Sequence, residues 1–283
     1  MRCAVLRGWF SLLVCAASCF AQAPLTGELE VVSYNVHGLP GLVTGDDTLA
    51  RLKAIGPKLE PFAIVGLQED FVPEGHPLLE RPNTFPARAR FDAALAGRVY
   101  GSGLCCFARA KVLSTYTEHF RSFNGVFDGA NDGLASKGFL LQRLELAPGV
   151  ELDVYTSHLD AGGGREDAAA RADQVTQLIR AMQTRSAGRA VLFLGDTNLK
   201  AKHELDARTL ARWQKATGLR CACLASQAEC CGRIDRVFVR SGAGLALEVR
   251  GWGVAPGFTD AKGQQLSDHE PIRATLRWTQ RAL

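Results

Sequence analysis

The sequence predicts an α/β fold (an α+β sandwich) in which mixed β-sheet packs against helices. Short apolar stretches of strand length alternate irregularly with amphipathic helical stretches, and several strands follow one another closely enough to pair as hairpins. No repeat, low-complexity run or long linker rich in Pro, Gly or Ser divides the 283 residues. We therefore expect a single domain over residues 24–283, a length that suits one large α/β unit.

The first residues have the composition of a secretory signal peptide. Arg2 and Arg7 flank the start of a long apolar run that continues to Phe20, and Ala21-Gln22-Ala23 supplies a small-x-small cleavage pattern. The run is too short for a comfortable membrane span. We expect residues 1–23 to be removed and the mature protein to be secreted or periplasmic. A lipoprotein anchor at Cys19 is the less favoured alternative.

Strands are expected where a short apolar run stops at a polar or turn-forming residue. These runs are residues 29–36, 63–68, 103–108, 137–146, 152–158, 190–195, 234–239 and 271–278.

Two stretches favour helices. Residues 48–59 predict a helix disturbed at Gly56-Pro57, because the residue before a proline resists the α conformation. Residues 166–185 give the clearest helical pattern, with acids in the first turn and Arg180 and Arg185 toward the end. One apolar stripe runs along this second helix, formed by Ala172, Val175, Leu178, Ile179 and Met182.

Nearly every predicted strand ends at a side chain capable of chemistry. These side chains are Asn35, Glu69, His158, Asp196, Asn198, Asp235, Asp268 and His269. Strand ends at one edge of a packed sheet can bring residues from distant sequence into a single pocket. The pattern therefore predicts one active site assembled from the whole chain.

Short motifs surround these residues. In chain order they are Ser33-Tyr34-Asn35-Val36, Leu67-Gln68-Glu69-Asp70, Ser157-His158-Leu159, Gly195-Asp196-Thr197-Asn198, Ile234-Asp235-Arg236-Val237 and Ser267-Asp268-His269. The set and its order resemble the endonuclease/exonuclease/phosphatase superfamily, which includes DNase I-like nucleases and neutral sphingomyelinases. The resemblance implies a DNase I-like four-layer fold, with two packed mixed β-sheets flanked by helices, and a hydrolase that acts on phosphodiesters.

Other stretches resemble neutral sphingomyelinases in particular. The run from Asn35 to Pro40 is similar to the first motif of that family, and His158-Leu159-Asp160-Ala161 is similar to its His-Leu-x-Ala. Asp132, Lys137 and the glycine after it have the spacing of its Asp-x-x-x-x-Lys-Gly element. The resemblance implies that Asp132 and Lys137 bind substrate, and a surface turn leading into a strand is weighed equally against it.

The chain also departs from that family. Asp160 stands where many members of that family carry a different residue, and the run Gly162-Gly163-Gly164 predicts a loose loop beside His158. No long aromatic hairpin for membrane insertion is found, so Trp252 and Phe258 are the nearest candidates for contact with a membrane. Isolated aromatic residues are, however, more often part of the core.

The oxygen-rich residues favour a hard divalent cation over zinc. Glu69 is the first candidate ligand, with Asn35 and Asp268 as partners, some of them through water. We expect Mg²⁺, or Mn²⁺ or Ca²⁺ in its place, to polarise the phosphorus and neutralise developing charge.

His269 is the preferred candidate for the general base, because imidazole can take a proton from water near neutral pH. Asp235 is the better orienting partner, since the adjacent Asp268 points to the opposite side of an extended chain. Asp196 and Asn198 are two residues apart and can address the same phosphate. His158 is expected to bind the phosphate or assist the leaving group, and the sequence leaves open which histidine is base and which is acid.

Three functions remain in view. The first is a secreted, monomeric, sphingomyelinase-like phospholipase C that acts on a phospholipid. If that phospholipid is part of a membrane, the reaction takes place at the membrane surface. The second is an exported nuclease, although no lysine- or arginine-rich stripe marks a nucleic-acid surface. Scattered cations could serve it, namely Arg88, Arg90, Arg165 and Arg236. The third is a non-catalytic binding protein that retains the fold.

The cysteines of the expected mature chain are even in number, which favours disulfides in an oxidising compartment. They are Cys105, Cys106, Cys221, Cys223, Cys230 and Cys231. The last four could cross-link a short loop, and a zinc site is the alternative that their spacing disfavours.

Overall fold

The computed structural model describes residues 24–125, 132–226 and 232–281 of the chain. The expected signal segment lies outside the described residues, as do Cys230 and Cys231. Its removal, and any disulfide to those two cysteines, therefore stay predictions.

Two six-stranded sheets form the centre of the molecule. The first contains, in spatial order, β11 (Leu245–Val254), β12 (Ile272–Gln280), β1 (Thr26–Asn35), β2 (Ile64–Gln68), β4 (Leu104–Ala108) and β3 (Ala87–Phe91). The second contains β5 (Lys111–His119), β6 (Gly138–Ala147), β7 (Val150–His158), β8 (Val191–Asp196), β10 (Asp235–Arg240) and β9 (Arg220–Cys221). Both are mixed, because β1 pairs with β2 and β7 with β8 in parallel while the other pairs are antiparallel.

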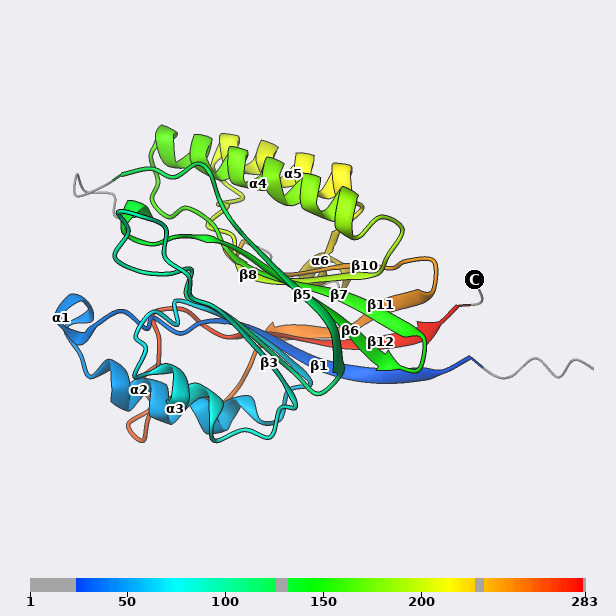
Figure 1. Cartoon of the computed structure of the whole chain (residues 1–283), viewed down its shortest axis with the longest axis horizontal. Coiled ribbons are helices and arrows are strands. Elements are labelled where there is room, and N and C mark those ends of the chain that lie inside the picture. Colours follow the sequence, from blue (N-terminus) through cyan, green and yellow to red (C-terminus); the bar gives the residue numbers. More distant parts are fainter. Residues whose placement is uncertain (1–23, 126–131, 227–231, 282–283) are drawn as a thin grey trace, which may run out of the picture.

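Helices cover the outer faces of both sheets, so the molecule has four layers (Figure 1). Along one face of the sandwich lie α1 (Gly41–Thr44), α2 (Thr48–Ile55), the 3-10 helix η1 (Gly56–Leu59) and α3 (His76–Glu80). The long helices on the other face are α4 (Arg165–Arg185) and α5 (Glu204–Thr217). The short elements η2 (Asp132–Leu134) and α6 (Ala222–Ala225) lie in connections. The predicted α/β class and the four-layer DNase I-like arrangement are confirmed.

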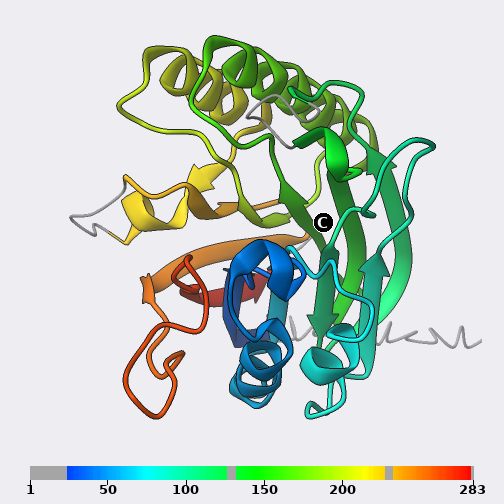
Figure 2. The ribbon, with the colours of Figure 1, turned by 90° about the vertical axis from the view of Figure 1, so that its left-hand side faces the viewer.

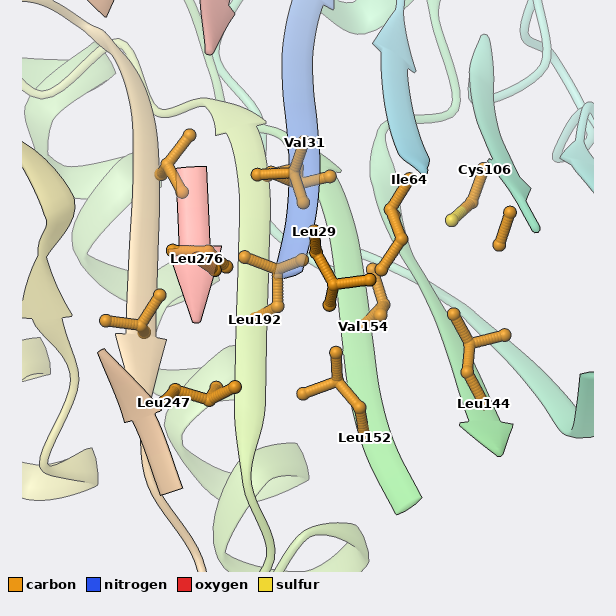
Figure 3. Close-up of a cluster of buried hydrophobic side chains, with 14 of the residues drawn as sticks. Leu29, Val31, Ile64, Cys106, Leu144, Leu152, Val154, Leu192, Leu247 and Leu276 are labelled. Atoms are coloured by element: carbon orange, nitrogen blue, oxygen red, sulfur yellow. The ribbon is translucent and has the colours of Figure 1, made fainter. Parts of the chain in front are cut away.

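The alternation of side chains along the strands builds this layering. In β1, Leu29 and Val31 point between the sheets, while Val32 and Tyr34 point toward the helices at the outer face. Figure 3 shows the inter-sheet cluster, in which Leu29 and Val31 lie near Val154. Each central strand is thus buried on both faces, which accounts for its continuous apolar sequence.

The expected break in the first helical stretch, residues 48–59, is present. α2 ends at Ile55 and the chain continues as η1 from Gly56 to Leu59. A Cβ atom at Gly56 would lie 2.1 Å from the carbonyl oxygen of Leu78, so this residue also permits close packing against the chain near α3.

The loop after His158 is not loose, which corrects the expectation from its glycines. Arg171 of α4 is fully buried and its Nη1 donates to the carbonyl oxygens of Asp160, Ala161 and Gly162 at 3.1, 3.0 and 3.3 Å. Its Nε and Nη2 donate to the buried carboxylate of Asp206 at 3.0 and 3.2 Å. A buried ion pair between α4 and α5 therefore holds the loop that follows the catalytic candidate.

We expect Arg171→Met to lower the free energy of unfolding by about 3–5 kcal/mol, because it leaves the carboxylate of Asp206 buried without its cation. Denaturant titration followed by circular dichroism measures the change. The double variant Arg171→Met/Asp206→Leu removes both charges and should be less destabilised than the single variant. Equal stability of the single variant and the wild type would show that the pair contributes nothing.

Two further expectations are corrected. Phe258 is 3% exposed and packs edge-on against Tyr34, with ring centroids 5.1 Å apart, and Trp252 packs against the core, so neither is an exposed membrane contact. Cys105, Cys106 and Cys221 are buried free thiols rather than disulfide partners. Among the described residues no helix is long and apolar enough to cross a membrane.

Candidate active site

The site lies at the edge of the sandwich where four neighbouring parallel-running strands end. Asn35 is the last residue of β1, Glu69 follows β2, His158 ends β7 and Asp196 ends β8. Figure 2 views the molecule from this side. The parallel register of β1 with β2 and of β7 with β8 places these ends level with one another.

Antiparallel strands begin at the same edge and bring the remaining residues. Asp235 opens β10 directly opposite Asp196, and Lys137 immediately precedes β6. Asp268 and His269 lie just before β12, which pairs with β1. Asp132 begins η2, and its side chain lies outside the described ones.

Asp196 is the centre of the cluster. Its Oδ2 lies 3.2 Å from Nδ2 of Asn35, 3.5 Å from Nε2 of His158 and 3.7 Å from Nε2 of His269. Burial, followed by the charge of Asp235, raises the pKa of Asp196 above its ordinary value. A buried carboxyl between two imidazoles can hold or pass a proton, which suits acid–base chemistry.

His269 forms a hydrogen-bonded pair with Asp235. Its Nδ1 lies 2.8 Å from Oδ2 of Asp235, which leaves Nε2 directed toward the side of Asp196. Burial by itself lowers the pKa of His269, but the hydrogen bond and charge of Asp235, with Asp196 adding to them, raise it to about 9. The separation of 2.8 Å is that of a hydrogen bond, so we assign these residues to proton transfer rather than to a metal.

We expect Asp235→Asn to lower the pKa of His269 from about 9, because the hydrogen bond and charge of Asp235 are the largest of the contributions that raise it. Titration of the imidazole C–H signals by NMR, in metal-free buffer, measures it. Asp268→Asn is the matched control and should lower the pKa less, since Asp268 is the smallest of the acidic contributions. A pKa that stays near 9 in Asp235→Asn would contradict the pairing.

His158 lies in a different environment. Nζ of Lys137 is 3.2 Å from its Nε2, and Nδ2 of Asn198 is 3.4 Å from the same atom. Burial, then the charge of Lys137, then that of His269 hold the pKa of His158 well below its ordinary value. His158 is therefore neutral at pH 7, and the donors of Lys137 and Asn198 beside it form a suitable environment for a phosphate oxygen.

Of the predicted metal ligands, Asn35 contacts Asp196 and Glu69 follows the neighbouring strand β2. Nδ2 of Asn35 donates to Oε1 of Glu69 at 2.9 Å, while Oε2 of Glu69 is buried and has no hydrogen-bond partner. The side chain of Asp268 is 58% exposed at the mouth of the site. An unpartnered buried carboxylate oxygen fits a hard divalent cation, which would supply the missing interaction.

Backbone strain is concentrated here. In the described part of the chain, the residues other than glycine with positive φ are His37, Glu69 and Asn198, at 49°, 61° and 48°. Such conformations persist only where the surrounding structure enforces them, and they cluster at functional sites. The sequence predicts chemically capable residues at these positions, but it gives no sign that their backbone is strained.

A buried network behind Glu69 was missed by sequence reasoning. Oδ2 of Asp70 lies 2.5 Å from Nδ1 of His76 and 2.9 Å from Sγ of Cys105, and Nε of Arg90 donates to it at 3.1 Å. Burial and then the charge of Asp70 raise the pKa of the Cys105 thiol well above its ordinary value. This thiol is therefore unreactive, and the network anchors the residue next to Glu69. The position of Asp70 directly after Glu69 was the only sign of this network in the sequence.

The chain is similar in sequence to curated proteins. A sphingomyelinase of Mycobacterium tuberculosis is 28% identical over 272 residues, which cover 87% of this chain and 52% of that protein. The chain thus spans about half the length of the curated relatives it matches first.

Solved structures share the fold. A mutant of beta toxin from Staphylococcus aureus with bound magnesium ions has a TM-score of 0.66 at 16% identity, covering 88% of this chain and 99% of that one. TDP2 of D. rerio in complex with a single-strand DNA product has a TM-score of 0.66 at 20% identity, covering 88% and 98%. Residues 32–269 match the family model described as Endonuclease/Exonuclease/phosphatase family, and the chain belongs to that family.

Proposed function

We propose that the protein is a divalent-metal-dependent phosphodiesterase that cleaves a lipid phosphodiester of the sphingomyelin type and releases the phosphorylated head group. The observation that carries the lipid assignment is a mainly apolar cavity of about 260 Å³ that opens onto the candidate catalytic residues. Its lining includes the polar side chains of Glu69, Lys137 and His158, and the remaining lining residues are Leu39, Val43, Phe71, Tyr100, Leu134, Ala135 and Ala161. The sequence similarity to a sphingomyelinase supports the same substrate class.

The residues divide the reaction between them. His269, oriented by Asp235, takes the proton from the attacking water. Lys137 and Asn198 donate hydrogen bonds to the phosphate oxygens, and neutral His158 lies where it can contact the same phosphate.

Glu69, Asn35 and Asp268 would hold the metal. When bound there, a divalent cation would neutralise charge on the phosphoryl oxygens and lower the pKa of the nearby His269 toward the neutral form that a general base needs. Mg²⁺ is the proposed ion, supported by the oxygen donors and by the magnesium in the beta toxin structure.

The aromatic part of the cavity suits the head group. The rings of Phe71 and Tyr100 lie 5.4 Å apart between centroids, and Tyr100 is half-buried at the cavity. A quaternary ammonium group is attracted to aromatic faces, so this wall supports a phosphocholine ester over an unmethylated one.

A short exposed helix adjoins the cavity and supports contact with a lipid surface. Leu42 of α1 is fully exposed and Val43, 63% exposed, lines the cavity. We expect Leu42→Ser to reduce hydrolysis of sphingomyelin in vesicles about 10-fold, because a leucine side chain transferred into an apolar phase contributes about 1.5–3 kcal/mol.

Hydrolysis of a soluble nitrophenyl phosphodiester by Leu42→Ser should match the wild type. Leu224→Ser is the matched control, since Leu224 is 64% exposed on α6 and lies in a different connection. Equal loss on vesicles and on the soluble ester would place Leu42 in the catalytic machinery instead.

A nuclease is the second candidate, because TDP2 shares the fold. Its expected cations are already used in the structure, however. Arg90 contacts Asp70 and Asp92, Arg236 is 4% exposed and donates to Thr197 and Leu199, and Arg88 pairs with Glu80. Of these four arginines, only Arg165 is exposed and takes part in none of these contacts.

The deciding experiment incubates the purified protein with sphingomyelin vesicles and with plasmid DNA, each with Mg²⁺ and with chelator. Metal-dependent release of phosphocholine is the expected result. DNA cleavage with intact lipid would support the nuclease function instead. Inactivity on both substrates, with metal bound, would favour a binding protein. We also propose export as a monomer, which N-terminal sequencing of the secreted or periplasmic protein and its size in solution test.

A further inference from the structure

His37 lies between two of the candidate metal ligands. Its Nδ1 is 3.2 Å from Oδ1 of Asp268 and 3.8 Å from Oε2 of Glu69. These carboxylates come from connections far apart in the sequence, and the imidazole is 25% exposed between them. His37 is not among the metal ligands that the sequence predicts.

The backbone is built to hold the imidazole there. The N–H of His37 donates to Oδ1 of Asn35 at 3.0 Å, and its carbonyl oxygen accepts from Nη2 of Arg51 at 2.8 Å. The residue has φ of 49°, and a Cβ at the next position, Gly38, would lie 2.3 Å from the carbonyl oxygen of Glu69. The segment is therefore fixed tightly against the residue that carries the buried carboxylate.

Each of the two distances from Nδ1, taken singly, is that of a pair of atoms that can bind the same ion. Ligand atoms about 2.2 Å from an ion lie about 3.1 Å apart at a right angle and about 3.8 Å apart at 120°. The two distances from Nδ1 match these values, and Oε2 of Glu69 has no hydrogen-bond partner of its own. The donor set then contains a nitrogen as well as carboxylate oxygens.

We propose that Nδ1 of His37 is a direct ligand of the divalent cation, which gives this site a preference for Mn²⁺ over Mg²⁺. Imidazole nitrogen is a better ligand for first-row transition ions than for Mg²⁺ or Ca²⁺, which favour oxygen. The inference rests on the proposed metal site and adds to it a ligand and a selectivity.

Pulsed electron paramagnetic resonance of the protein loaded with Mn²⁺ tests the ligand. We expect the wild type to show the ¹⁴N modulation of a directly bound imidazole and His37→Asn to lose it. Asparagine tolerates positive φ, so the backbone conformation is preserved. His37→Gly, which accepts this φ without strain, repeats the test if the first variant fails to fold.

Calorimetric titration tests the selectivity. Mn²⁺ should bind the wild type at least about 10-fold more tightly than Mg²⁺, and this ratio should fall toward unity in His37→Asn. His203→Asn is the matched control, because His203 lies at the start of α5, and it should keep both the ¹⁴N signal and the ratio.

The outcomes separate this inference from the proposed function. Bound Mn²⁺ without ¹⁴N modulation in the wild type, or modulation unchanged in both His37 variants, overturns the ligand assignment and leaves the metal site standing. Failure of the wild type to bind Mn²⁺ or Mg²⁺ at all overturns both.

Discussion

Replacing His269 with alanine is expected to lower kcat for phosphodiester hydrolysis about 10³-fold, within the range of 10²–10⁴ that a positioned general base contributes. The hydrogen bond of 2.8 Å between Nδ1 and Asp235 fixes the ring, and the alanine variant has no group to take the proton from water. KM should change little, because the loss belongs to the transition state. Initial rates on sphingomyelin in the presence of Mg²⁺ measure both parameters.

The control for this prediction is His203→Asn, which removes an imidazole outside the site and should retain wild-type kcat. Circular dichroism of both variants verifies that the fold is intact. A kcat for His269→Ala within 10-fold of the wild type would assign the base to another residue, and His158 would be the next candidate because its pKa is lowered and it is neutral.

Glu69→Gln is expected to weaken Mg²⁺ binding by at least about 100-fold, since it removes the charge from the buried carboxylate whose Oε2 has no other partner. The amide keeps an acceptor for Nδ2 of Asn35, so the local structure should survive. Calorimetric titration measures the affinity, and raising the Mg²⁺ concentration should restore part of the lost activity.

Glu74→Gln is the matched control, because Glu74 is an exposed acid in the connection that follows β2. It should bind Mg²⁺ as the wild type does. Unchanged affinity in Glu69→Gln, or equal losses in the two variants, would remove Glu69 from the metal site.

The two predictions distinguish the halves of the site. Asp196 contacts both sets of residues, namely Asn35 among the proposed metal ligands and His158 and His269 among the others. Loss of His269 should therefore leave metal affinity nearly intact, whereas loss of Glu69 should reduce both binding and turnover.

The sequence by itself determined the central strands, the long helix α4 and the break at Gly56-Pro57. These features depend on local physics: strands buried on both faces need continuous apolar residues, and a residue before proline resists the α conformation. It also placed chemically capable residues at strand boundaries, although Asp235, Asp268 and His269 lie where a strand begins rather than where an apolar run stops.

Other elements gave no readable signal. The helix α5 buries Trp213 together with the polar residues Asp206, Thr209 and Thr217, so its inward face mixes apolar and polar side chains. The strands β5 and β11 lie at the edges of their sheets and leave many residues exposed or half-buried, which weakens the alternation.

Only the tertiary structure decided how the site residues meet. The pairing of Asp235 with His269 was expected, whereas the contacts of Asp196 with Asn35 and of His37 with Asp268 join segments that no local pattern relates. The same is true of the ion pair between Arg171 and Asp206, which holds a loop that its glycines predicted to be loose. Such contacts depend on sheet order, register and the packing of one layer on another, and these are set by the sum of many long-range interactions rather than by any single stretch of sequence.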